Sequence, residues 1–195
     1  MWIKICGMTT PAAVSAALAA GVDAIGFVFA ESVRRVTPEF ARTLAAPARG
    51  RVACIAVTRY ATQHELDAML ASFAPDVLQA DPDDLGAIRL PRQLSLLPVL
   101  RAGSGPPQPL PARLLFEGPV SGSGVACDWS AARALAQRTQ LILAGGLNAG
   151  NVAAAIRSVQ PFGVDVSSGV EERSGVKSPQ AIARFVEAVR QGGEL

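Results

Sequence analysis

Histidine and cysteine are scarce in this chain of 195 residues. The only histidine is His64, so a histidine-based catalytic triad or a site with several histidine metal ligands is excluded. The three cysteines, Cys6, Cys54 and Cys127, are odd in number and lie far apart. No pair has the short spacing of a metal site, and no disulfide framework is implied. We therefore expect reduced thiols and no bound metal.

Long hydrophobic runs and concentrated charge are also missing. Half of the residues are hydrophobic, yet no apolar stretch reaches the roughly 18 residues that a membrane helix needs. The segment from Met1 to Met8 is too short for a signal peptide. The net charge is +2 and the arginines are scattered, which disfavours nucleic acid as a partner. We expect one cytoplasmic domain over residues 1–195 that binds a small molecule, with neither a nucleic acid nor a membrane as partner.

Short β-rich runs alternate with alanine-rich helical stretches along the whole chain. Thr10-Pro11 and Thr37-Pro38 each combine a helix N-cap with a proline at the first helical position. The eight predicted strands occupy residues 2–7, 24–29, 51–57, 76–80, 95–103, 112–118, 140–147 and 163–170.

Eight nearly apolar strands, mostly separated by helices, predict a parallel sheet covered on both faces and closed into a (βα)8 TIM barrel. An open doubly wound sheet is the alternative, but no G-x-G-x-x-G motif follows the first strand. The barrel should be small and trimmed. Its fifth helix should be replaced by the proline-rich loop "SGPPQPLP" at residues 104–111, because proline lacks the helical N–H donor.

The active site of such a barrel lies at the carboxyl ends of its strands. Gly145 and Gly146 follow the seventh predicted strand, and Ser167, Ser168 and Gly169 end the eighth. Glycines expose backbone N–H groups, and a Ser-Ser-Gly turn that opens a short helix attracts anions. Either motif alone could simply make a tight turn, but the two at consecutive strand ends favour a phosphate site.

Four segments together resemble the phosphoribosylanthranilate isomerase family: "KICGMT", "GFVFAESVRRVTPE", "LAGGLNAGNV" and "GVDVSSGVEERSGVK". They cover about half of the chain in the family's order, whereas residues 53–112 match poorly. The resemblance implies a (βα)8 enzyme of tryptophan biosynthesis without a metal or organic cofactor, as a monomer or homodimer. Its reaction would convert N-(5-phosphoribosyl)anthranilate to the 1-deoxyribulose isomer by an Amadori rearrangement.

The resemblance makes Cys6, in "KICG", the general base that removes the C2′ proton of the opened substrate. A free thiol has a pKa of about 8.5, so we expect a nearby positive or dipolar group to lower the pKa of Cys6. On the residues alone, Cys6 could instead pack in the core like an alanine.

The family's general acid is an aspartate that ends strand six in a Leu-Leu-Asp pattern, and this sequence departs from that pattern. If Leu115-Phe116-Glu117 matches it, Glu117 is the acid, and we expect burial in an apolar mouth beside Phe116 to raise its pKa. If Leu114-Leu115 aligns instead, Phe116 takes that place and no acid is present. Asp128 is the fallback acid, although it looks more like a helix N-cap.

Other candidates line the expected pocket. The resemblance assigns Arg34 to the anthranilate carboxylate, which a guanidinium fork suits. Gln79 should line the pocket wall, with Ala80 in place of the family's strand-four histidine and His64 too remote to replace it. Arg101 replaces a family lysine on strand five. Asp165, on strand eight, is a candidate substrate-binding residue.

Two other functions stay open on the sequence alone. A non-catalytic or re-specialised phosphate-binding paralogue would keep the phosphate loops, and a Phe116 side chain in the mouth would favour it. Another isomerase or lyase of the ribulose-phosphate-binding barrels could use Lys4, which shares the strand face of Cys6.

Overall fold

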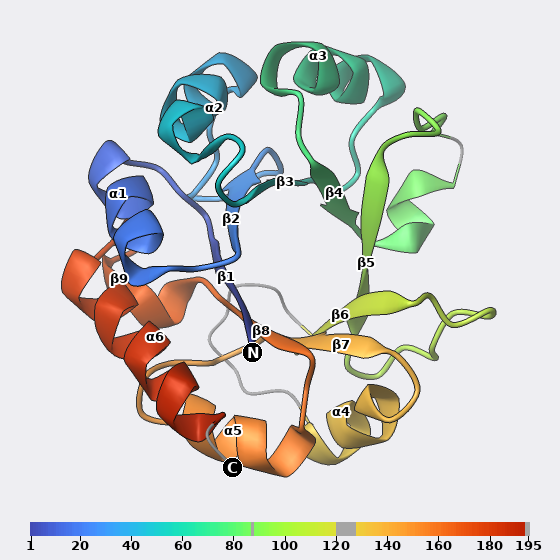
Figure 1. The fold of residues 1–195 in the computed structure, drawn as a ribbon. Coiled ribbons are helices and arrows are strands. Elements are labelled where there is room, and N and C mark those ends of the chain that lie inside the picture. The colour runs from blue at the N-terminus through green and yellow to red at the C-terminus, as the bar shows by residue number, and fades with distance from the viewer. Residues whose placement is uncertain (87, 120–127, 194–195) are drawn as a thin grey trace.

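A computed structural model describes residues 1–86, 88–119 and 128–193 of the chain. Eight strands form a closed barrel in sequence order, and every neighbouring pair is parallel, including β8 with β1 (Figure 1). The predicted (βα)8 barrel is therefore confirmed. The strands are β1 (Trp2–Cys6), β2 (Ala24–Val28), β3 (Ala53–Val57), β4 (Val77–Ala80), β5 (Ser95–Arg101), β6 (Arg113–Glu117), β7 (Gln140–Leu143) and β8 (Gly163–Val166).

Helices surround the ring of strands (Figure 1). Thr10 and Thr37 cap two of them as predicted, because each threonine side chain accepts a hydrogen bond from a backbone N–H of the first turn. The α-helices are α1 (Pro11–Ala20), α2 (Pro38–Ala45), α3 (Gln63–Phe73), α4 (Trp129–Ala136), α5 (Val152–Val159) and α6 (Pro179–Gly192). The described residues also form the 3-10 turns η1 (Ala46–Ala48), η2 (Pro82–Leu85) and η3 (Ser168–Val170).

The connection between β5 and β6 contains no helix at residues 104–111, all of which the structure describes. The predicted loss of the fifth helix is confirmed, and the prolines there explain it. A small antiparallel hairpin, β9 (Glu171–Arg173) with β10 (Val176–Lys177), lies between β8 and α6. The sequence did not predict this hairpin, whose Lys177 donates a hydrogen bond to the backbone carbonyl of Ser167, the residue after β8.

Alternation along the strands divides the side chains into two sets. One apolar cluster lies between strands and helices and contains Leu114 and Phe116 of β6 together with Leu135 of α4. A second cluster contains Leu115 of β6 and Ile142 of β7, which point into the barrel. The inner face also carries buried polar side chains, namely Lys4, Gln79 and Asp165.

Within the three described ranges, no helix is both long enough and apolar enough to cross a membrane.

Candidate active site

On the inner face of the barrel, β1 and β8 bring a thiol, an ammonium group and a carboxylate together. Cys6 is 7% exposed, and Lys4, two residues earlier on the same strand face, is fully buried. The Lys4 Nζ donates a hydrogen bond of 3.0 Å to the Oδ1 of Asp165, its register partner on β8. A Cβ at Gly26 of β2 would lie 3.0 Å from the Cys6 Sγ and 3.1 Å from the Lys4 Nζ. Gly26 therefore leaves the space in which the thiol and the ammonium group meet.

The electrostatics of this group differ from the sequence-based expectation. Burial raises the pKa of the Cys6 thiol, because the thiolate loses hydration. Lys4 and Lys177 oppose that rise, whereas Asp165 adds to it. The predicted net lowering of the Cys6 pKa is wrong for this structure, although the predicted positive neighbours are present. Burial alone would lower the pKa of Lys4, but the charges of Asp165 and Cys6 outweigh it and the Lys4 pKa is raised.

Arg34 lies beside this group but already holds a carboxylate of the protein. Its Nε and Nη2 donate to the two carboxylate oxygens of Glu171 at 2.6 and 2.9 Å. The Arg34 stem crosses Gly7, where a Cβ would lie 2.6 Å from the Arg34 Cδ and where φ is +80°. Glycine is thus required both for the turn after Cys6 and for the approach of Arg34.

Glu171 and Lys177 tie the β9–β10 hairpin to the end of β8. The Lys177 Nζ donates to the Glu171 Oε1 at 2.8 Å, and to the backbone carbonyl and hydroxyl of Ser167 at 3.0 and 3.1 Å. The Ser167 hydroxyl in turn donates to the carbonyl of Cys6 at 3.1 Å. Ser167 therefore links the hairpin to β1 through its side chain.

Burial alone would raise the pKa of Glu171, but hydrogen bonds from Arg34 and Lys177 lower it to about 2.

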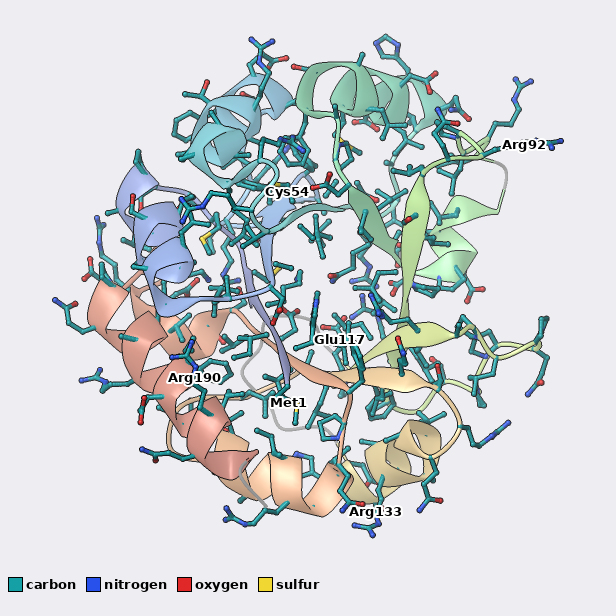
Figure 2. All side chains as sticks on the ribbon, viewed as in Figure 1. Met1, Cys54, Arg92, Glu117, Arg133 and Arg190 are labelled. Atoms are coloured by element: carbon teal, nitrogen blue, oxygen red, sulfur yellow. The ribbon has the colours of Figure 1, made fainter. Side chains whose placement is uncertain are left out.

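The carboxyl ends of β4, β5 and β6 carry a second charged group. Arg101 and Glu117 are register partners, and the Arg101 Nη1 lies 2.7 Å from the Glu117 Oε1. The Arg101 Nε and Nη2 donate to the Oδ2 of Asp81 at 3.1 and 2.9 Å. Figure 2 shows Glu117 inside the ring of strands, whereas Arg92, Arg133 and Arg190 lie outside it.

Phe116 lies on the opposite face of β6 from Glu117. It packs in the cluster between strands and helices and is 3% exposed. The Glu117 side chain is largely buried, at 13% exposure, but the expectation that it lies beside Phe116 is wrong, because neighbouring residues of a strand point to opposite faces. A Phe116 side chain in the mouth would have favoured the non-catalytic paralogue, and the structure places this side chain elsewhere.

Strand β4 supplies Gln79 to the inner face. Gln79 is 6% exposed, and its Oε1 is buried without a hydrogen-bond partner among the described residues. Ala80, which follows it, is also buried. The next residue, Asp81, carries the carboxylate that accepts a hydrogen bond from Arg101. His64 is exposed on α3, as expected.

The loops after β7 and β8 lie directly against each other. A Cβ at Gly169 would lie 1.9 Å from the carbonyl oxygen of Leu147, so only glycine allows this approach. Gly145 and Gly146 have positive φ angles of 89° and 65°. In the described part of the chain, the N–H groups of these two glycines, Ser168 and Gly169 make no backbone hydrogen bond outside helices and strands.

Asp128, the fallback acid, is an exposed N-cap. Its carboxylate accepts hydrogen bonds from the backbone N–H groups of Ser130 and Ala131 at the start of α4. Hydrogen bonds from Ser130, followed by that from Ala131, lower the pKa of Asp128. Cys127, one of the three cysteines, lies outside the described residues.

Cavities at the barrel mouth give room beside these groups. One cavity of about 280 Å³ is lined by Asp81 and Arg101, near the ends of β4 and β5. A larger one of about 570 Å³ lies between α2 and α3 and includes Arg35 and Tyr60, but none of the predicted site residues. We therefore locate the chemistry by the inward-facing side chains rather than by the cavity between α2 and α3.

Residues 3–188 match the family model described as "N-(5'phosphoribosyl)anthranilate (PRA) isomerase". The chain belongs to this isomerase family. A curated relative of that name from Mesorhizobium japonicum is 37% identical, with 96% of this chain and 94% of the relative covered. A relative of the same name from Brucella canis is also 37% identical, over 96% of this chain and 93% of its own length.

Solved structures of the isomerase family share the barrel. TrpF from Jonesia denitrificans is 39% identical with a TM-score of 0.82, covering 100% of this chain and 98% of its own. A 26% identical family structure holds reduced 1-(o-carboxyphenylamino)-1-deoxyribulose 5-phosphate, with a TM-score of 0.82 and coverages of 98% and 99%. The isomerase from Thermotoga maritima is described as dimeric, with monomeric forms generated from it. The family membership that the sequence motifs indicated is confirmed.

Three charged residues of the candidate site were not assigned a role from the sequence. Glu171 and Lys177 stand inside the motif "GVDVSSGVEERSGVK". Glu171 pairs with Arg34, which is distant in the sequence, and with Lys177 across the hairpin that the sequence did not predict. Asp81 follows the inward-facing Gln79 by two positions, so alternation along β4 directs it to the barrel mouth, as its place at the end of the fourth predicted strand also indicates.

Proposed function

We propose that this chain isomerises N-(5-phospho-β-D-ribosyl)anthranilate to 1-(2-carboxyphenylamino)-1-deoxy-D-ribulose 5-phosphate, a step of L-tryptophan biosynthesis, with Cys6 as the general base. The observation that supports this role is the Cys6 thiol on the inner barrel face beside the Lys4 ammonium group. A thiol that must stay reduced fits a cytoplasmic enzyme, and we propose that it acts there as a monomer or homodimer.

The proposed reaction begins with ring opening. Glu117 gives a proton to the furanose ring oxygen as the bond between that oxygen and C1′ breaks, which leaves a Schiff base. The Cys6 thiolate then takes the C2′ proton, and the electron pair of that C–H bond forms an enolamine. Tautomerisation of the enolamine gives the ketone, so the product has the same atoms as the substrate.

Glu117 suits the acid role by position, because it ends β6 on the inner face, three strands away from β1 around the barrel. Arg101 holds the Glu117 carboxylate, and Asp81 holds Arg101 from the other side. We propose that these two residues orient the acid and that Arg101 also contacts substrate. A proton on Glu117 would have to compete with the Arg101 ion pair, so the acid function depends on the protonation state reached with substrate bound.

Substrate binding is proposed at three places. Arg34 receives the anthranilate carboxylate on the N–H groups that Glu171 does not use, since a guanidinium has five donors. Gln79, with its unpartnered Oε1, and Asp165 face the ribose. Backbone N–H groups at Gly145, Gly146, Ser168 and Gly169 hold the phosphate, with Ser167 fixing the turn.

The activity is tested by complementation of a tryptophan auxotroph that lacks this isomerase. We expect growth with the wild-type chain and none with Cys6→Ser, although both proteins accumulate to equal levels. Absence of growth with a folded wild-type chain would contradict the proposed activity. Growth with Cys6→Ser would contradict the role of the thiol only.

A further inference from the structure

The ammonium group of Lys4 is fully buried in the barrel. A charged group without water is costly unless a partner compensates it, and lysine is almost never fully buried alone. Asp165 supplies the compensating charge at 3.0 Å across the β1–β8 pair. The reaction steps above assign no proton or bond to Lys4, so its burial calls for another explanation.

Three features place the Lys4 ammonium against the thiol rather than elsewhere. The strand alternation puts Lys4 one inner layer below Cys6. The Lys4 Nζ and the Cys6 Sγ lie 3.1 and 3.0 Å from the point that a Gly26 Cβ would occupy, so the two atoms are within about 6 Å of each other. Among the described residues, the ammonium donates a hydrogen bond to Asp165, and an ammonium has three donors.

The second buried lysine near the thiol is placed differently. Lys177 of β10 donates to two oxygens of Ser167 and to Glu171, which matches its three donors. Besides Lys4, Asp165 and Lys177, the described charged groups that act on Cys6 include Arg34, which Glu171 holds. Of the two buried lysines near the thiol, Lys4 is therefore the one with donors left for a sulfur anion.

We propose that Lys4 is a positioning residue for the isomerase reaction: its buried ammonium group, kept charged by Asp165, stabilises the thiolate of Cys6 that takes the C2′ proton. This inference rests on the proposed function, in which Cys6 is the base. An opposite charge within about 4–6 Å lowers the pKa of an acid by about 1–3 units. Lys4 thus counteracts the effect of burial on the thiol, and Asp165 prevents burial from discharging Lys4.

The test is the pH dependence of Cys6 alkylation by iodoacetamide, followed by mass spectrometry of the peptide that contains Cys6. Lys4→Met should raise the midpoint of that dependence by at least about one pH unit and slow alkylation near neutral pH about tenfold. The rising limb of the pH profile of kcat should move in the same direction. Cys54, a buried thiol in the outer cluster, is the control within the same molecule, and its alkylation should not change.

Lys4→Met leaves the Asp165 carboxylate buried without its partner and could prevent folding. The double variant Lys4→Met/Asp165→Asn removes both charges, and its alkylation midpoint should still rise because Lys4 acts on the thiol more strongly than Asp165 does. Gly26→Ala keeps every charge but crowds the point where the two groups meet, so it should raise the midpoint as well.

The outcomes separate the inference from the proposed function. An unchanged alkylation midpoint in the folded double variant, together with an inactive Cys6→Ser, would overturn the role of Lys4 and leave the function standing. Wild-type turnover by Cys6→Ser would overturn the proposed base, whatever the Lys4 variants do. A lower melting temperature with an unchanged midpoint and an unchanged kcat profile would show that Lys4 is structural only.

Discussion

Arg34 and Glu171 form a two-point ion pair, with the Arg34 Nε 2.6 Å from one carboxylate oxygen and Nη2 2.9 Å from the other. Both side chains are largely buried, at 12% and 6% exposure. Such a planar pair fixes the guanidinium in one orientation. Glu171 therefore holds Arg34 with its remaining donors available to a second carboxylate.

Arg34→Ala should weaken substrate binding more than it slows the chemistry, because the anthranilate carboxylate does not react. A charge-assisted hydrogen bond contributes about 1.5–3 kcal/mol, so KM should rise about 10- to 100-fold with kcat little changed. Steady-state kinetics measure both constants. A loss of several orders in kcat with KM intact would instead place Arg34 at the reacting atoms.

Glu171→Gln should raise KM in the same way but by a smaller factor, because Arg34 stays charged and loses only its orientation. The exposed neighbour offers a matched control, since Glu172→Gln removes the same charge one residue away. Equal effects of the two substitutions on KM would show that net charge, not the orientation of Arg34, is responsible.

Stability should fall in acid as Glu171 takes up a proton. The pKa of Glu171 is about 2 in the folded chain, below the value of about 4.3 for an unfolded glutamate. A depressed folded pKa gives stability that is complete above the unfolded pKa and is lost as the pH falls towards 2.

Urea unfolding between pH 6 and pH 3 measures this dependence. Glu171→Gln should lower the free energy of unfolding at pH 6 by about 1–3 kcal/mol and should make it depend less on pH over this interval. A pH dependence identical to that of the wild type would contradict the contribution of Glu171.

Cys6→Ser and Glu117→Gln should each keep the fold and reduce kcat by about 10²–10⁴-fold, the usual size of a general acid–base contribution. The acid variant should keep more activity, since the substrate ring opens to some extent without catalysis. Asp128→Asn is the control, because Asp128 caps α4 at an exposed position. Wild-type turnover by Glu117→Gln with an inactive Asp128→Asn would place the acid downstream of β6.

Gly169→Ala should damage the proposed phosphate site and the fold around it. Its Cβ would lie 1.9 Å from the Leu147 carbonyl oxygen, so the loops after β7 and β8 must separate. We expect a lower melting temperature and at least about tenfold weaker binding of inorganic phosphate, measured by calorimetry. Gly105→Ala is the control, because its Cβ would meet nothing within 4 Å. Unchanged phosphate binding by a folded Gly169→Ala variant would move the site elsewhere.

The sequence by itself determined the elements and their order. Strand-like runs, threonine caps before proline and the proline-rich segment at residues 104–111 are local signals, because propensity and capping act within a few residues. The positions of Cys6 and of the glycines after β7 could be predicted for the same reason, since a strand's end fixes which residues reach the mouth.

Only the tertiary structure decided which charged groups meet. Lys4 pairs with Asp165 across 161 residues of sequence, and Arg34 pairs with Glu171 across 137. Closure of the barrel between β1 and β8 creates the first pair, and the hairpin after β8 creates the second. The register of β5 with β6 likewise sets Glu117 against Arg101 and turns Phe116 outward. Side-chain charges carry no local signal of their partners, because Coulomb energy depends on distance in space and on burial, which the fold alone supplies.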